Sequence, residues 1–163
     1  MRRIFILVCF AVLGALTSCD DGRIYDTHID IENALWPESK ELVYDFEVKD
    51  PQQAYNVIYN VRYANTYPYY NLYIHYYLAD STGKALRDHQ LHMDLFDSKT
   101  GKPLGKGLGD LFDGSFLNQD LKAYKFPYAG KYKMKLKQYM RQSQLQGISS
   151  VGVKVEKVEA MEK

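Results

Sequence analysis

Residues 42–48 read Leu-Val-Tyr-Asp-Phe-Glu-Val, and this stretch indicates the fold class of the chain. Every second residue, from Leu42 to Val48, is apolar, and the residues between are mostly charged. A period of two is typical of a strand that has one face on a core and the other in water. An amphipathic helix would repeat every 3.6 residues instead. We therefore expect a half-buried β-strand here.

The same alternation recurs along the chain, separated by turn sequences such as Asp-Ser-Thr-Gly at 80–83 and Asp-Ser-Lys-Thr-Gly at 97–101. No window shows a sustained helical stripe of apolar residues. About eight strands are expected. They lie near residues 24–31, 42–48, 55–63, 72–78, 91–95, 124–128, 132–140 and 151–155. Strands at this spacing without helices between them predict an all-β fold, an antiparallel, jelly-roll-like β-sandwich in a single domain.

Composition excludes several classes of protein. A chain of 163 residues is long enough for one domain and short for two. The formal net charge of +1 lacks the excess of basic residues expected of a nucleic-acid-binding protein. The 15 tyrosines are unusual, and they favour pleated, half-buried surfaces and the rims of binding sites.

The amino terminus has the layout of an export signal. Arg2 and Arg3 precede an apolar run that ends in small residues and Cys19, followed by two aspartates. Residues 16–19, Leu-Thr-Ser-Cys, look like a bacterial lipobox, in which the cysteine sulfur accepts a diacylglyceryl group before cleavage. We expect residues 1–18 to be a removed lipoprotein signal peptide and residues 19–163 to be a lipid-anchored domain. A simple secretory signal with a chance cysteine is the alternative.

Cysteine usage agrees with this interpretation. Of the two cysteines, Cys9 lies in the removed run and Cys19 carries the lipid. The mature domain then has no thiol for a disulfide or a zinc site.

The stretch 101–120 contains five glycines and has no clear period, so we expect a long loop. Long loops in compact domains are often functional. Glycines 105, 107 and 109 would let the chain present its neighbours freely. The candidate partner-binding residues of this loop are Lys106, Leu108, Leu111 and Phe112.

A tyrosine cluster offers a different binding chemistry. Aromatic faces on β-sandwiches stack against sugar rings while their hydroxyls bond outward. The candidate glycan-stacking residues are Tyr67, Tyr69, Tyr70 and Tyr73. The alternative is that Tyr73, His75 and Tyr77 pack under a neighbouring loop.

Other charged patterns carry weaker signals. Lysines 131, 133, 135 and 137, with Arg141, form a positive stripe for an acidic partner or lipid phosphates, or a solvated face, possibly on an edge strand. His89 and His92 point to opposite faces of a strand, which does not suit a metal. Asp26, His28 and Asp30 share a face, but we expect no bound metal and no cofactor. Asp110 and Asp113 form a carboxylate pair too common to indicate a glycosidase.

Three segments together carry a family resemblance. They are Asn-Thr-Tyr-Pro-Tyr-Tyr-Asn-Leu-Tyr at 65–73, Gly-Lys-Pro-Leu-Gly-Lys-Gly-Leu-Gly-Asp at 101–110, and Met-Arg at 140–141 with Leu-Gln-Gly-Ile at 145–148 and Val-Gly-Val-Lys-Val-Glu at 151–156. In this order, behind a lipobox, they resemble the gliding motility lipoprotein GldH family. The resemblance covers nearly the whole mature chain.

The resemblance implies a non-catalytic lipoprotein of the cell envelope, most readily of the outer membrane, with protein partners in a gliding machinery. It implies no enzymatic activity. A surface glycan-binding lipoprotein is the alternative function. A hydrolase on a jelly roll is a third option, and it would need a cleft lined by convergent acids.

Overall fold

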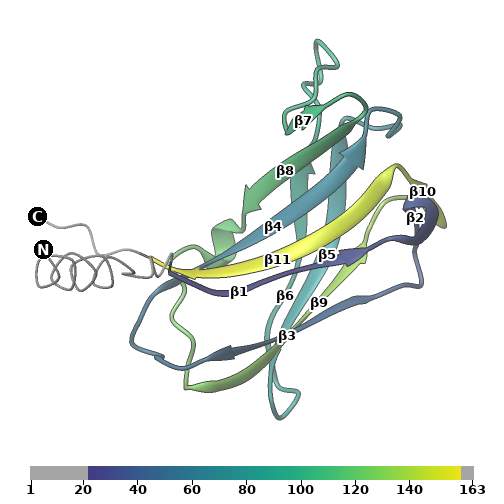
Figure 1. Cartoon of the computed structure of the whole chain (residues 1–163). Helices are drawn as coiled ribbons and strands as arrows, with labels where there is room; N and C mark the ends of the chain where they lie inside the picture. The colour runs from purple at the N-terminus through teal and green to yellow at the C-terminus, as the bar shows by residue number, and fades with distance from the viewer. Residues whose placement is uncertain (1–21, 159–163) are drawn as a thin grey trace, which may run out of the picture.

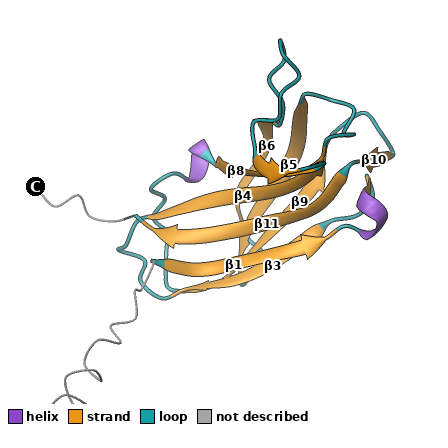
Figure 2. Ribbon diagram, turned by 45° about the horizontal axis from the view of Figure 1, so that its top comes forward, coloured by secondary structure: helices purple, strands orange, loops and turns teal. Residues whose placement is uncertain are grey.

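Two antiparallel sheets face each other as two layers around one core, and a short two-stranded sheet closes one end (Figures 1 and 2). This computed structural model describes residues 22–158. The five-stranded sheet contains, in spatial order, β1 (Arg23–Asp30), β11 (Ile148–Lys157), β4 (Tyr55–Ala64), β8 (Leu111–Leu117) and β7 (Lys106–Leu108). The four-stranded sheet contains β3 (Leu42–Val48), β9 (Gly130–Gln138), β5 (Asn71–Asp80) and β6 (Ala85–Asp94). The small sheet pairs β2 (Leu35–Pro37) with β10 (Gln144–Gln146), and the 3₁₀ turns are η1 (Glu32–Ala34) and η2 (Gln119–Leu121).

The pairing of the long strands is nested. β5 pairs with β6, β4 with β8, β3 with β9 and β1 with β11, all antiparallel. The chain therefore behaves as one long hairpin whose tip is the turn between β5 and β6, rolled up into two layers. This is a jelly-roll arrangement, and it confirms the predicted antiparallel β-sandwich.

Alternation along the strands places the core as predicted. In β3 the burial pattern alternates without exception from Leu42 to Val48. Strand β9 of the four-stranded sheet buries Tyr132, Met134 and Leu136. Strand β11 of the five-stranded sheet buries Val151, Val153 and Val155 in the same core. The two inner faces thus interdigitate between the sheets, as in other sandwiches.

Seven tyrosines are buried in this core, and some of their hydroxyls form hydrogen bonds across it. Tyr44 of β3 donates to the carbonyl of Val151 on β11, at 2.7 Å. Tyr63 of β4 donates to the carbonyl of Leu95, which follows β6, at 2.6 Å. Both bonds cross from one layer to the other. Among the described residues, no buried side-chain nitrogen or oxygen lacks a hydrogen-bond partner.

Two predicted segments differ from the structure. The expected strand at 124–128 is wrong, because the only strand-like pairing there is an isolated bridge between Tyr124 and Tyr55. Phe126 is buried instead, and its ring contacts the rings of Phe46 and Tyr132. Aromatic residues at alternate positions imitated a strand although they pack from a loop.

The expected long loop at 101–120 is also partly wrong, because it contains the hairpin β7–β8. Glycines at 107 and 114 interrupt the alternation of apolar and polar residues in these strands. A Cβ at Gly107 would lie 2.0 Å from the carbonyl oxygen of Leu111, and one at Gly114 would lie 2.6 Å from the ring of Phe116. These positions must lack a side chain, so they leave no apolar signal in the sequence.

The inter-layer bond of Tyr44 is open to a direct test. Tyr44→Phe removes the hydroxyl and leaves the Val151 carbonyl without this donor in the core, so we expect a loss of about 1–2 kcal/mol in the free energy of unfolding. Urea unfolding measures the change. Tyr70→Phe is the matched control, because Tyr70 is 50% exposed. Equal midpoints for both variants would contradict the proposed role of the Tyr44 bond.

Candidate functional site

The hairpin β7–β8 presents an apolar tip. Leu108 and Leu111 pair across the hairpin on either side of a two-residue turn, Gly109-Asp110. Gly109 has φ +69°, which suits a turn whose first central residue is glycine. Leu108 is 95% exposed and Leu111 is 47% exposed. Two facing leucines in water make this tip a candidate contact surface.

The four predicted partner-binding residues do not all share this surface. Lys106 is exposed and pairs in register with Asp113 at the far end of the hairpin. Phe112 is half-buried, and its ring lies 5.9 Å from the ring of Tyr63 in the core. Phe112 therefore packs beneath the hairpin, and the exposed apolar residues of the tip are Leu108 and Leu111.

The hairpin tip lies at the end of the sandwich opposite Gly22 and Val158, the first and last residues that the structure describes (Figure 1). At one end of β4, Tyr55 pairs with Lys157, whose amide donates to the carbonyl of Gly22. At the other end, Ala64 pairs with Leu111. Nine residue steps along a strand span about 30 Å. The tip is therefore separated by that distance from the point where the chain enters the domain.

The tyrosine cluster is divided by the structure. Tyr67 is only 5% exposed and donates to the carbonyl of Asn71 at 2.9 Å, so it is a core residue and its ring is not open to a sugar. Tyr70 is 50% exposed but borders no groove described below. Tyr69 and Tyr73 do line one groove together, and Tyr139 completes it. Sequence reasoning missed Tyr139, although it continues the outward parity of the lysines on β9.

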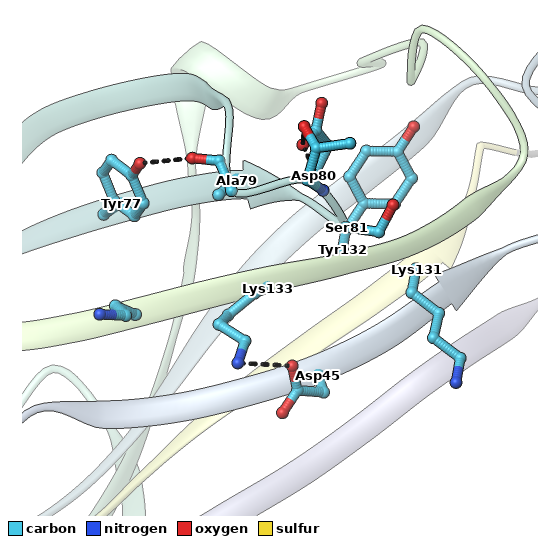
Figure 3. A pocket seen from close by; sticks show the side chains of 11 residues that line it. Asp45, Tyr77, Ala79, Asp80, Ser81, Lys131, Tyr132 and Lys133 are labelled. Atoms are coloured by element: carbon cyan, nitrogen blue, oxygen red, sulfur yellow. Dashed lines mark hydrogen bonds and ion pairs between the residues drawn. The ribbon is translucent and has the colours of Figure 1, made fainter.

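The lysine stripe lies on the outer face of the four-stranded sheet, as its alternation predicts. Its strand is not an edge, because β9 pairs with both β3 and β5. Figure 3 shows Lys131 and Lys133 beside a groove of about 660 Å³ at the β5–β6 turn. Lys133 lies 3.5 Å from Asp45, and Lys135 lies 3.1 Å from Glu41. The acids beside this sheet face offset part of the positive charge.

The turn at the end of this groove is tightly bonded. Asp80 Oδ1 accepts from the Thr82 hydroxyl at 2.6 Å, from the Thr82 amide at 2.9 Å and from the Lys84 amide at 3.0 Å. These bonds hold the charged form. The Thr82 hydroxyl above all, followed by the Tyr128 hydroxyl, lowers the pKa of Asp80 to about 2.

Histidines and carboxylates occur as separate pairs. His75 lies 2.9 Å from Asp88, His92 lies 3.0 Å from Asp94, and His89 lies 3.5 Å from Asp120. These are partly exposed contacts of small energetic weight. Within residues 22–158, no group of three or more His, Cys, Asp or Glu side chains is placed to hold a metal ion, and this includes Asp26, His28 and Asp30.

The carboxylates of Asp110 and Asp113, noted as a pair in the sequence, do not line a cleft among those described here. Asp113 accepts two hydrogen bonds from Arg62, at 2.8 and 3.1 Å. Asp110 lies in the exposed hairpin turn, where its backbone carbonyl accepts from Asn65. A general acid and base would have to face one substrate across a groove, and these two side chains border none of the grooves described here.

Comparison with known proteins adds a family to this geometry. The family model described as GldH lipoprotein matches residues 23–155, which is nearly all of the described domain. The chain belongs to the GldH lipoprotein family. This membership confirms the resemblance read from the three sequence segments, and the family model covers both the hairpin and the tyrosine groove.

Two curated relatives are similar over most of their length. One is a gliding motility lipoprotein GldH homolog of Christiangramia forsetii, 29% identical, covering 94% of this chain and 94% of its own. The other is the gliding motility lipoprotein GldH of Flavobacterium johnsoniae, 29% identical, covering 93% of this chain and 94% of its own. Among solved structures, the infectious bursal disease virus Gx strain structure aligns at 10% identity with a TM-score of 0.37, over 86% of this chain and 31% of that one. A similarity this low does not bear on function.

The predicted anchor falls outside the described residues. Cys19 and residues 1–18 precede Gly22, the first residue that the structure describes. In the described part of the GldH chain, no helix has the length and apolar character needed to cross a membrane.

The Asp80 turn predicts a defined dependence of stability on pH. The pKa of Asp80 is about 2 when folded, below its ordinary value of about 3.9. Its contribution to stability is therefore fully present above about pH 4 and is lost as the pH falls toward 2. We expect the melting temperature of Asp80→Asn to lie below that of the wild type at pH 6 and to approach it at pH 2.5. A gap that stays constant over this range would contradict the assignment.

Proposed function

We propose that this protein is a non-catalytic, lipid-anchored component of the gliding motility machinery in the cell envelope, held in the outer membrane. Residues 1–18 serve as its export signal, and the acylated Cys19 is its anchor. Family membership and the names of both curated relatives support a motility lipoprotein. The sequence order of charge, apolar run, small residues and cysteine supports the anchor.

One structural observation carries the mode of action. The exposed leucine pair of the hairpin lies at the end of β4 opposite Gly22, and Cys19 precedes Gly22 by only three residues. A domain tethered at Cys19 therefore holds this apolar tip about 30 Å from its attachment point. A surface so placed faces away from the lipid and is suited to a protein partner in the envelope.

Charge patterning is consistent with this orientation. The tip carries no lysine between Lys106 and the end of β8. The lysine groove of Figure 3 lies nearer the point where the chain enters the domain, because Lys131 pairs with Glu47, and Glu47 lines a pocket together with Arg23. The partner contact at the tip is accordingly apolar. It gains affinity from burying leucine area rather than from long-range attraction.

The anchor is tested by Cys19→Ala. This change removes the only sulfur in the lipobox, so we expect an unacylated protein that no longer partitions into the membrane fraction. Mass spectrometry of the mature amino terminus gives the answer. A wild-type terminus at any residue other than Cys19, or without lipid, would end this part of the proposal.

The hairpin tip is tested by Leu108→Asp in the native cells. Because Leu108 is 95% exposed, the domain should keep its melting temperature. Burying one leucine at an interface contributes about 1.5–3 kcal/mol, so we expect at least about a tenfold loss of crosslinked partner, together with loss of motility. Quantitative crosslinking with equal protein abundance provides the measurement.

Two further variants make the result specific. Val43→Asp adds the same charge at a 39% exposed apolar site on the opposite sheet and should leave partner binding unchanged. Phe112→Asp should instead lower stability, because its ring packs against Tyr63 in the core. Normal partner capture and motility by Leu108→Asp would refute a role for the tip.

A further inference from the structure

A groove of about 580 Å³ lies on the domain between the start of β5 and the segment that follows β9. Three tyrosines, Arg141 and two glutamines line it together with Met140. The volume falls within the range of small-molecule sites. This groove is separate from the hairpin tip, and its role does not depend on the proposed motility function.

The buried side-chain amide of Gln138 holds the segment 139–142, which lines one side of the groove. Gln138, at 0% exposure, donates to the carbonyl of Gln142 at 2.7 Å and accepts from the amide of Met140 at 2.8 Å. The amide of Tyr139 donates to the carbonyl of Tyr73 at 2.8 Å, which joins this turn to β5. The segment that carries Tyr139 and Arg141 is thus held in place before any ligand arrives, which limits the entropy lost on binding.

Ring contacts position Tyr73 and Tyr139 of the groove but leave both side chains partly exposed. Tyr73 stacks on His92 with ring centroids 4.9 Å apart, and Tyr139 is tilted against His75 at 5.8 Å. Tyr139 remains 58% exposed. Over residues 22–158, the hydroxyls of Tyr69, Tyr73 and Tyr139 form no hydrogen bond with another residue, unlike those of the core tyrosines. Partly exposed rings with unbonded hydroxyls suit a hydroxylated ring as ligand.

The charge of the groove is positive. Arg141 forms no hydrogen bond or ion pair with any other residue of the described chain, and none of the residues lining the groove is acidic. Lys137 lies two residues before Tyr139 and pairs with His75, but it lines a different groove. A guanidinium with its donors free binds a carboxylate in two parallel hydrogen bonds. The ligand should therefore carry a carboxylate.

We propose that this groove binds an acidic saccharide, namely a glycan segment that contains uronic acid units. Tyr73 and Tyr139 stack on sugar rings, Arg141 binds the carboxylate, and Gln90 and Gln142 bind ring hydroxyls. The site replaces the stacking platform expected from the sequence: Tyr69 and Tyr73 are retained, Tyr67 and Tyr70 are excluded, and Tyr139 is added. Partly exposed aromatic rings favour a sugar over an acidic peptide, whose carboxylates would need no aromatic faces.

The test uses the full-length protein, purified in detergent, and calorimetric titration. The probes are hexagalacturonate, hexamannuronate and the methyl ester of each, which keeps the rings and removes the charge. We expect at least one acid hexamer to bind with a dissociation constant on the order of 0.1–1 mM, and its ester form to bind about tenfold more weakly. Hexaglutamate should bind no better than the ester.

Variants then assign the binding to the groove. Tyr139→Ala and Arg141→Gln should each weaken acid-hexamer binding about tenfold without a change in melting temperature. Tyr70→Ala is the matched control, since it removes an exposed tyrosine outside the groove and should bind like the wild type. Absence of binding by both acid hexamers at 5 mM, equal binding of the ester or of hexaglutamate, or unchanged binding by Tyr139→Ala would each overturn the proposal.

Discussion

Burying a tyrosine brings a hydroxyl into the core, and that hydroxyl must find a partner there. This requirement governs how the two layers of the GldH domain meet. Tyr44 and Tyr63 reach carbonyls that belong to the opposite layer, and Tyr59 accepts from the side chain of Asn118. An unbonded hydroxyl would cost more than its bond contributes. The layers are therefore fixed in register by directional bonds, whereas apolar packing alone tolerates sliding.

The same residue type serves the opposite purpose at the surface. Tyr69, Tyr73 and Tyr139 are anchored through their backbone or ring contacts, and their hydroxyls remain without partners among the described residues. The leucine pair of the hairpin and this groove lie at the same end of the roll, because β5 begins and β9 ends at the end where β4 meets Leu111. The apolar tip and the polar aromatic groove therefore lie together at the end of the domain opposite Gly22.

How far the sequence predicts this molecule depends on which property each residue reports. In β3, β9 and β11 apolar residues alternate with polar ones along much of each strand, and this alternation predicts which face is buried. These strands and the sandwich could therefore be predicted. Gly107 and Gly114 report nothing, because the constraint they satisfy is the absence of a side chain. The burial of Tyr67 could not be predicted, because its hydroxyl is bonded to the backbone carbonyl of Asn71, and the position of a backbone carbonyl cannot be inferred from residue types. Tyr139 follows from parity along β9, but its groove needs the turn that Gln138 holds.

Nested pairing also sets the order in which the domain can form. Ile29 near the start of the roll pairs with Val151 near its end, and β11 lies between β1 and β4 in the five-stranded sheet. Until the last strand is available, β1 has no neighbour in its sheet and the Val151 carbonyl cannot receive the Tyr44 hydroxyl. A chain delivered from its amino terminus therefore stays unfinished until nearly all of it has emerged. Such distant pairing slows folding, and for a polypeptide that must be threaded through a channel it keeps the strands open for passage.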